Sequence, residues 1–188
     1  MEDASMENIK VHTLAVLVDN ASGVLSQVTR LFSRKGCNIE SLAVGATDDP
    51  AVSRITIEIK TDEARAKLLC NQLRKLIPVH SVKHLEEDNE IRRELVLIKV
   101  RANTSAQRNE IIQIANIFRA SIIDVSLGSL TLAVIGTENK TDAIQKLVSE
   151  FGILELVRTG MVALERGLHT INEETKEKGE FDYGKNVL

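Results

Sequence analysis

The chain has 188 residues, of which 43% are hydrophobic and 3% aromatic, and its 24 basic and 27 acidic residues leave a formal net charge of −3. This composition is typical of a soluble globular protein, and the length falls between one domain and two. The charge offers no basic surface for nucleic acid and the few aromatic residues leave little for base stacking, so we expect no nucleic-acid partner.

The sequence also predicts no membrane span and no secretory signal. No apolar run approaches the roughly 20 residues that cross a bilayer, and residues 1–12 hold three acids and no apolar signal core. The two cysteines, Cys37 and Cys70, lack the spacing of a metal or redox motif. We interpret them as small buried apolar residues in a reducing compartment.

The first half of the chain opens with a strand, a helix and a hairpin. Residues 12–18 form an apolar run typical of a buried strand, and five apolar residues in 24–32 then recur with helical spacing. A β-rich run at 38–47, a turn at 48–50 and strict alternation around 55–59 predict the two strands of a hairpin.

A second helix is expected from Asp62 to Ile77, where Pro78 stops it, and a strand at 79–85 follows. The order is βαββαβ, and the second half repeats it. Its elements are a strand at 94–100, a helix around 111–118, two strands in 121–136 that turn near Gly128, a helix around 143–151, and a strand at 153–164 in which Gly160 favours a break.

We therefore predict an α+β fold of two tandem ferredoxin-like βαββαβ units, each with both helices on one face of a four-stranded antiparallel sheet. A unit of about 75 residues has a marginal core, and its other sheet face has to be polar or covered, so we expect a dimer or docking of the two units. The predicted boundaries are an N-terminal extension at 1–11, a first unit at 12–86, a charged linker at 87–93, a second unit at 94–165 and a loosely held polar tail at 166–188.

Motifs for catalysis, phosphate binding or zinc binding are absent from the sequence. Of His12, His80, His84 and His169, only His80 and His84 approach ligand spacing, and in a strand such residues stand about 13 Å apart. We therefore predict no catalytic residue and no metal site, with the histidines at the surface or at sheet edges.

The segment at 19–42 contains a candidate anion site. A helix that begins near Gly23 leaves its first N–H groups without intrahelical partners, and with the helix dipole they favour a carboxylate. Gly23 lacks a Cβ atom, so a ligand can approach the backbone closely. Val24 and Leu25 add apolar surface, which suits a small hydrophobic side chain.

Asn38 and Ile39, just past this helix, place an amide beside an aliphatic surface. Residues 23–35 span roughly 18 Å as a helix, so Gly23 and Asn38 of one chain stand at opposite ends. A two-fold dimer would bring one chain's Gly23 to the other chain's Asn38. The alternative is an ordinary loop, in which Asn20 is a turn residue and Asn38 only begins a strand.

Six segments carry a family resemblance: HTLAVLVDNASGVLSQVTRLFSRKGCNIESLAVG (12–45), DDPAVSRITIEI (48–59), QLRKLIPVHSV (72–82), RRELVLIKV (92–100), IFRASIIDVS (117–126) and VRTGMVALERG (157–167). They resemble the regulatory (small) subunit of acetohydroxyacid synthase, also called acetolactate synthase, which carries an N-terminal ACT domain. The resemblance covers about residues 12–167 and implies that the first unit is an ACT domain, an amino-acid sensor of βαββαβ topology.

The resemblance further implies a homodimer that binds the pathway end product, usually valine, in two interface sites. One chain would contribute Asn20, Gly23, Val24 and Leu25, and the other Asn38 and Ile39. The chain itself would be non-catalytic and cofactor-free. It would activate a catalytic subunit that holds thiamine diphosphate, magnesium and FAD, and pass feedback inhibition to it, in the bacterial cytoplasm or the plastid stroma.

Two other functions remain open on the residues alone. One is an ACT amino-acid sensor with a different client protein, which would not need the second-half segments quoted above. The other is a small enzyme, for which turnover of pyruvate by the purified chain without a partner would be the deciding observation.

Overall fold

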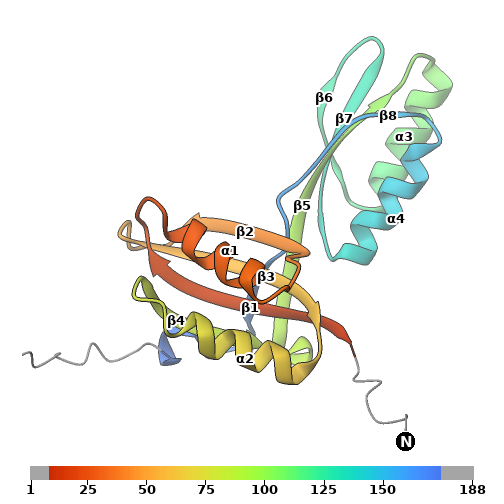
Figure 1. The fold of residues 1–188 in the computed structure, drawn as a ribbon. Helices are drawn as coiled ribbons and strands as arrows, with labels where there is room; N and C mark the ends of the chain where they lie inside the picture. Colours follow the sequence, from red (N-terminus) through yellow and green to blue (C-terminus); the bar gives the residue numbers. More distant parts are fainter. Residues whose placement is uncertain (1–8, 175–188) are drawn as a thin grey trace, which may run out of the picture. The chain divides into compact units, whose positions relative to one another are not determined.

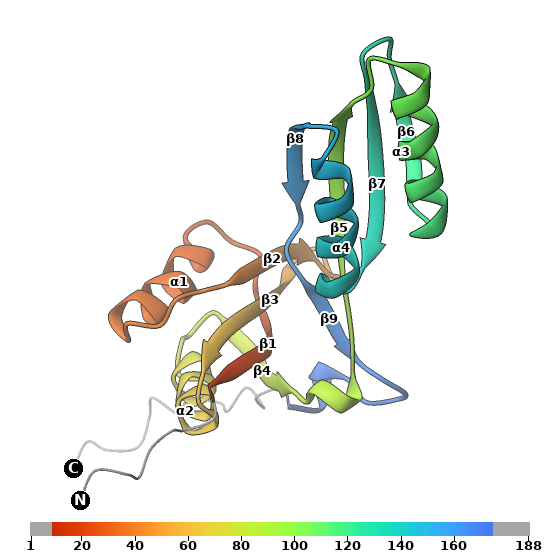
Figure 2. The same cartoon turned by 90° about the vertical axis from the view of Figure 1, so that its right-hand side faces the viewer.

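The computed structural model describes residues 9–174, so the ends of the predicted extension and tail lie outside the described residues. The described residues form two compact units (Figures 1 and 2). The first contains 9–40, 44–89 and 165–174, and the second contains 41–43 and 90–164. No helix in the described part of the chain has both the length and the apolar character needed to cross a membrane.

The first unit has the predicted βαββαβ order, and its sheet has the strand order β2-β3-β1-β4. Strand β1 pairs antiparallel with β3 on one side and β4 on the other, which leaves β2 and β4 at the sheet edges. Both helices lie on the same side of this sheet (Figure 2). The elements are β1 (Lys10–Asp19), α1 (Val24–Arg34), β2 (Ser41–Ala46), β3 (Val52–Thr61), α2 (Glu63–Leu73) and β4 (Val79–Leu85).

The core of this unit lies between the helices and the sheet. Alternate residues of the two central strands face helix residues that recur every three or four positions, because these are the two periods at which side chains share one face. The main buried side chains are Leu14, Val16, Val28, Leu31, Phe32, Ile55, Ile57, Ile59, Leu69 and Leu73.

The opposite face of the first sheet is polar and is covered by residues from the predicted tail. The Ser81 hydroxyl donates to the carbonyl of Ile171 at 2.7 Å, and Lys83 forms an ion pair with Glu165 at 2.6 Å. Ile171 is buried in a short 3-10 helix, η2 (Ile171–Glu174). The expectation of a loose tail is therefore wrong for residues 166–171, in which Thr170 and Ile171 accept hydrogen bonds from β4.

The second unit repeats the architecture, with a sheet of order β6-β7-β5-β8 and an additional strand, β9, paired with β5. Helices α3 and α4 contribute buried residues to one core with the sheet, so both cover the same face. The elements are β5 (Glu90–Arg101), α3 (Ser105–Ile117), β6 (Ser121–Val125), β7 (Ser129–Gly136), α4 (Glu138–Ser149), β8 (Ile153–Arg158) and β9 (Val162–Glu165). The break between β8 and β9 includes Gly160 at φ +79°, which confirms the expected interruption.

Several element boundaries differ from the sequence predictions, and the structure explains the difference for helix α2 and for the predicted linker. Helix α2 ends at Leu73 rather than at Ile77, which is 99% exposed, and the Leu76 N–H already bonds the Leu73 carbonyl in a turn. The predicted linker at 87–93 is only partly a linker. A short 3-10 helix, η1 (Glu87–Asn89), leads directly into β5, which begins at Glu90 because β9 gives β5 an additional partner.

Candidate ligand-binding site at the start of helix α1

Helix α1 begins at an open glycine. Gly23 is the N-cap residue and adopts φ 83° and ψ −10°, a left-handed conformation that glycine adopts without steric cost. No side chain caps the helix and its first turn contains no acidic residue. A Cβ atom on Gly23 would meet no atom of the described residues within 4 Å, apart from its two chain neighbours.

Two backbone donors at this helix start have no acceptor in the described part of the chain. The first intrahelical bond runs from the Gln27 N–H to the Gly23 carbonyl at 3.1 Å, and the Val24 N–H makes a long bond to Ala21 at 3.4 Å. The N–H groups of Leu25 and Ser26 therefore remain available. Together with the positive end of the helix dipole, they can bind one carboxylate.

The predicted apolar residues of this site differ in exposure. Val24 is 5% exposed and its side chain belongs to the core, so only its backbone borders the open space. Leu25 is 41% exposed and provides apolar surface at the helix start.

Asn20 connects this helix start to the β2–β3 turn. Its backbone N–H bonds the Ala51 carbonyl at 2.7 Å, and its side-chain NH2 donates to the Pro50 carbonyl at 2.9 Å. The Asn20 side-chain NH2 group is therefore already bonded within the first unit. The open end of α1 therefore lies beside the end of β2 that leads into this turn.

Asn38 and Ile39 lie past the other end of the helix. The 11 residues of α1 span about 16 Å at 1.5 Å per residue, so one chain does not bring Asn38 to Gly23. Asn38 is exposed and donates from Nδ2 to Glu40 Oε1 at 2.9 Å, while Ile39 is half-buried. The sequence did not indicate Glu40 as a residue that orients the Asn38 amide, because this contact depends on the rotamers of both side chains.

Three of the four histidines lie where the sequence suggested, since His80 and His84 are on the edge strand β4 and His169 is exposed. His80 falls at an irregularity in β4, where Val79 pairs with Val18 and Ser81 pairs with Leu17. Its Nε2 contacts Asp19 Oδ1 at 2.7 Å, away from His84.

His12 is 2% exposed, which overturns the expectation of a surface or edge histidine, and it contacts His84. The sequence carried no signal for this pair, because the predicted sheet did not include the register of the strands at 12–18 and 79–85.

Comparisons with known proteins match both units to one family. Residues 14–81 match the family described as the AHAS small subunit-like ACT domain, and residues 93–167 match the small subunit of acetolactate synthase. The acetolactate synthase small subunit of Mycolicibacterium smegmatis is 46% identical over 156 residues, which cover 83% of this chain and 91% of that protein. A probable acetolactate synthase small subunit of Methanothermobacter thermautotrophicus is 43% identical over 160 residues, 85% of this chain and 95% of that protein.

A solved structure shares the fold. The crystal structure of the acetolactate synthase small subunit from Thermotoga maritima superposes with a TM-score of 0.80 at 36% identity. The match covers 85% of this chain and 99% of the other.

Proposed function

Because the chain belongs to the family of acetolactate synthase small subunits, we propose that it is a non-catalytic regulatory subunit that senses a branched-chain amino acid, with valine as the first candidate. Two copies would share each sensing site, and the bound amino acid would inhibit the catalytic subunit that this chain otherwise activates. The observation that carries the proposal is the start of α1, where two N–H donors have no acceptor and no side chain caps the helix within residues 9–174.

The chemistry of the helix start fits an amino acid. The carboxylate would accept from the Leu25 and Ser26 N–H groups, and Gly23 allows it to approach without a Cβ in its path. The exposed part of Leu25 suits an aliphatic side chain. Since Asn38 Nδ2 already donates to Glu40, the Asn38 side-chain oxygen of a second chain is the group that can accept from the ammonium.

A two-fold axis beside β2 would assemble this site. Strand β2 is at the edge of its sheet, it begins just after Asn38, and it ends at the turn to which Asn20 is bonded. Antiparallel pairing of two β2 strands places the beginning of one beside the end of the other. Asn38 and Ile39 of one copy would thereby approach Gly23 of the other, with Asn20, Val24 and Leu25 completing that half.

We assign the catalysis by acetolactate synthase to the partner subunit and not to this chain. No motif in this chain suggests a nucleophile or a cofactor loop, so thiamine diphosphate, magnesium and FAD are expected on the partner. The match of residues 93–167 to the small-subunit family favours this client over a different one, because an ACT sensor of another protein would not need that half.

The proposal is tested by reconstitution. The purified chain is mixed with a candidate catalytic subunit, and pyruvate condensation is assayed with and without valine, leucine or isoleucine. We expect co-purification, higher activity than the catalytic subunit has alone, and inhibition by at least one of the three amino acids. Activation without any inhibition would refute the sensing site, and failure to associate would favour a different client.

A further inference from the structure

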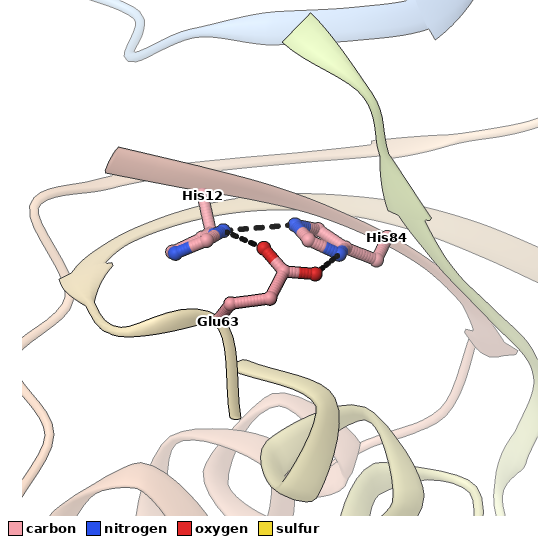
Figure 3. A group of neighbouring side chains, drawn as sticks. All are labelled: His12, Glu63 and His84. Carbon is pink, nitrogen blue, oxygen red and sulfur yellow. Dashed lines mark hydrogen bonds and ion pairs between the residues drawn. The ribbon is translucent and has the colours of Figure 1, made fainter. Parts of the chain in front are cut away.

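Three polar side chains from different elements of the first unit meet on one face of its sheet (Figure 3). His12 lies on β1, His84 lies on β4, and Glu63 is the first residue of α2. His12 Nδ1 lies 3.0 Å from His84 Nε2 and 3.7 Å from Glu63 Oε2. Glu63 Oε1 lies 3.8 Å from His84 Nδ1, so the carboxylate reaches both rings.

The backbone brings these side chains together. Leu14 pairs with His84 in the β1–β4 ladder, and His12 stands two residues before Leu14, so both histidines project from one face as diagonal neighbours. Glu63 reaches the same place because α2 begins almost directly after β3, with Asp62 as its N-cap residue. The cluster is therefore built on two strands and a capped helix rather than on a loop.

A backbone carbonyl decides which nitrogen of His12 carries the proton. His12 Nε2 lies 3.1 Å from the carbonyl oxygen of Thr61, which only accepts hydrogen bonds, so Nε2 donates. In the tautomer that this bond selects, the Nδ1 lone pair faces His84 and Glu63. Metal-ligating histidines are commonly oriented in this way, through a bond from their other ring nitrogen to a carbonyl. The His12 side chain is 1% exposed, so this orientation is fixed by packing.

We propose that His12 Nδ1, His84 Nε2 and the Glu63 carboxylate bind a divalent transition-metal ion, with Zn²⁺ as the best fit. Two imidazoles and one carboxylate are a known zinc donor set that leaves a fourth position for water or another ligand. Ligand atoms around tetrahedral zinc stand about 3.4 Å apart, given bonds of about 2.0–2.1 Å. The two separations measured from His12 Nδ1, 3.0 and 3.7 Å, lie on either side of that value.

Two lysines compete with a metal for the carboxylate. Lys67 Nζ lies 3.3 Å from Glu63 Oε1 and Lys10 Nζ lies 3.9 Å from Glu63 Oε2. Their side chains are 68% and 52% exposed, so both ammonium groups can move into water when a cation binds. A bound ion would link β1, α2 and β4 and stabilise the first unit. This inference stands independently of the amino-acid site at Gly23.

The experiment uses the full chain after chelator treatment and dialysis, titrated with Zn²⁺ in competition with a fluorescent zinc indicator. We expect one Zn²⁺ per chain. His84→Gln and Glu63→Gln should each weaken binding at least tenfold. His80→Gln is the matched control, because His80 lies on the same strand but contacts Asp19. These variants avoid His12, whose burial makes its replacement a risk to folding.

A second measurement separates metal binding from a purely structural role of the cluster. Zn²⁺ should raise the melting temperature of the parent and of His80→Gln, but not of His84→Gln or Glu63→Gln, and Mg²⁺ should have no such effect because it prefers oxygen ligands. Absence of Zn²⁺ binding to the parent would overturn the proposal. Equal Zn²⁺ binding by all variants would also overturn it, because the ion would then sit on other groups such as Cys37. An equal rise in melting temperature with Mg²⁺ would overturn it as well.

Discussion

At the residue scale, Gly23 combines two properties that a substitution can separate. Its positive φ makes any side chain strained, although Asn and Asp tolerate this region better than most residues. A Cβ atom there, however, meets no described atom within 4 Å beyond the two neighbouring residues. In Gly23→Asp the strain of about 1–2 kcal/mol is partly offset by 0.3–1 kcal/mol from the helix dipole, so we expect the fold to survive.

The expected effect of Gly23→Asp on sensing is much larger. Its carboxylate would occupy the place of the amino-acid carboxylate, and like charges about 4 Å apart repel by roughly 1–4 kcal/mol, so valine inhibition should weaken at least about fivefold. Gly23→Asn is the matched control, because its side chain has the same size and no charge. It should lose less of its sensitivity to valine than Gly23→Asp. Valine titrations of the reconstituted complex measure both variants. If Gly23→Asp remains as sensitive as the parent, the helix start is not the sensor.

Asn38 tests the other half of the shared site. Asn38→Ala removes a neutral polar contact worth roughly 0.5–1.5 kcal/mol, so we expect up to about tenfold weaker inhibition by valine. Because Asn38 is exposed and its side chain bonds only Glu40 in the described part of the chain, the free energy of unfolding should change little. The valine titration and a urea unfolding curve are measured on the same preparation. A large loss of stability would contradict this assignment.

Cys37, which precedes Asn38 in the sequence, should be a poor nucleophile. Burial raises the pKa of its thiol, and Glu40 raises it further, while Arg65 lowers it less than burial raises it. A raised pKa leaves less thiolate at neutral pH, so alkylation by iodoacetamide at pH 7.5 should be slower than for a cysteine peptide. Peptide mapping after timed alkylation gives the rate, with the urea-unfolded chain as control. A rate equal to that of the unfolded chain would disprove the expectation.

At the element scale, the helices differ in how their first turns are satisfied. Helix α3 has a capping box, in which the Thr104 hydroxyl accepts from the Gln107 N–H and the Gln107 side chain accepts from the Thr104 N–H. Helix α4 begins after Thr137, whose side chain makes no capping bond. Helix α1 has no side-chain cap, which leaves its first turn open for the ligand that we propose.

This difference gives a stability prediction with an internal control. Thr104→Ala should lower the free energy of unfolding by about 1 kcal/mol, because it removes the cap of α3. Thr137→Ala should change it by less, since no side-chain cap is lost. Urea unfolding of both variants makes the comparison, and valine inhibition should be unchanged in both. Equal losses of stability would show that the capping box is not the source of the effect.

At the scale of the whole molecule, the shared-site proposal requires two copies. Sedimentation at micromolar concentration should give twice the chain mass of 20.8 kDa. A ligand that binds only the folded dimer stabilises it by RT ln(1 + [L]/Kd), about 2.7 kcal/mol at a hundredfold excess over Kd. Valine should therefore raise the melting temperature. A chain that stays monomeric with and without valine would rule out a site built from two copies.

The sequence by itself determined the order of elements and the start of α1. Alternation every two residues and recurrence every three or four are local patterns, and they locate strands and helices before any pairing is known. Gly23 without an acidic first turn is likewise visible in the residues alone. The end of α2 was misplaced because Leu76 and Ile77 continue the apolar pattern, although Ile77 faces solvent in a turn.

Only the tertiary structure decided which side chains from different strands and helices contact one another. His12 and His84 are 72 residues apart in sequence, and their contact depends on the register of β1 against β4, which no local pattern contains. The irregularity in β4 moves His80 out of the ladder, and Glu63 joins the pair because a helix begins where β3 ends. Periodicity places a side chain on a face, whereas register decides its neighbour, because pairing is selected by the packing of the whole core.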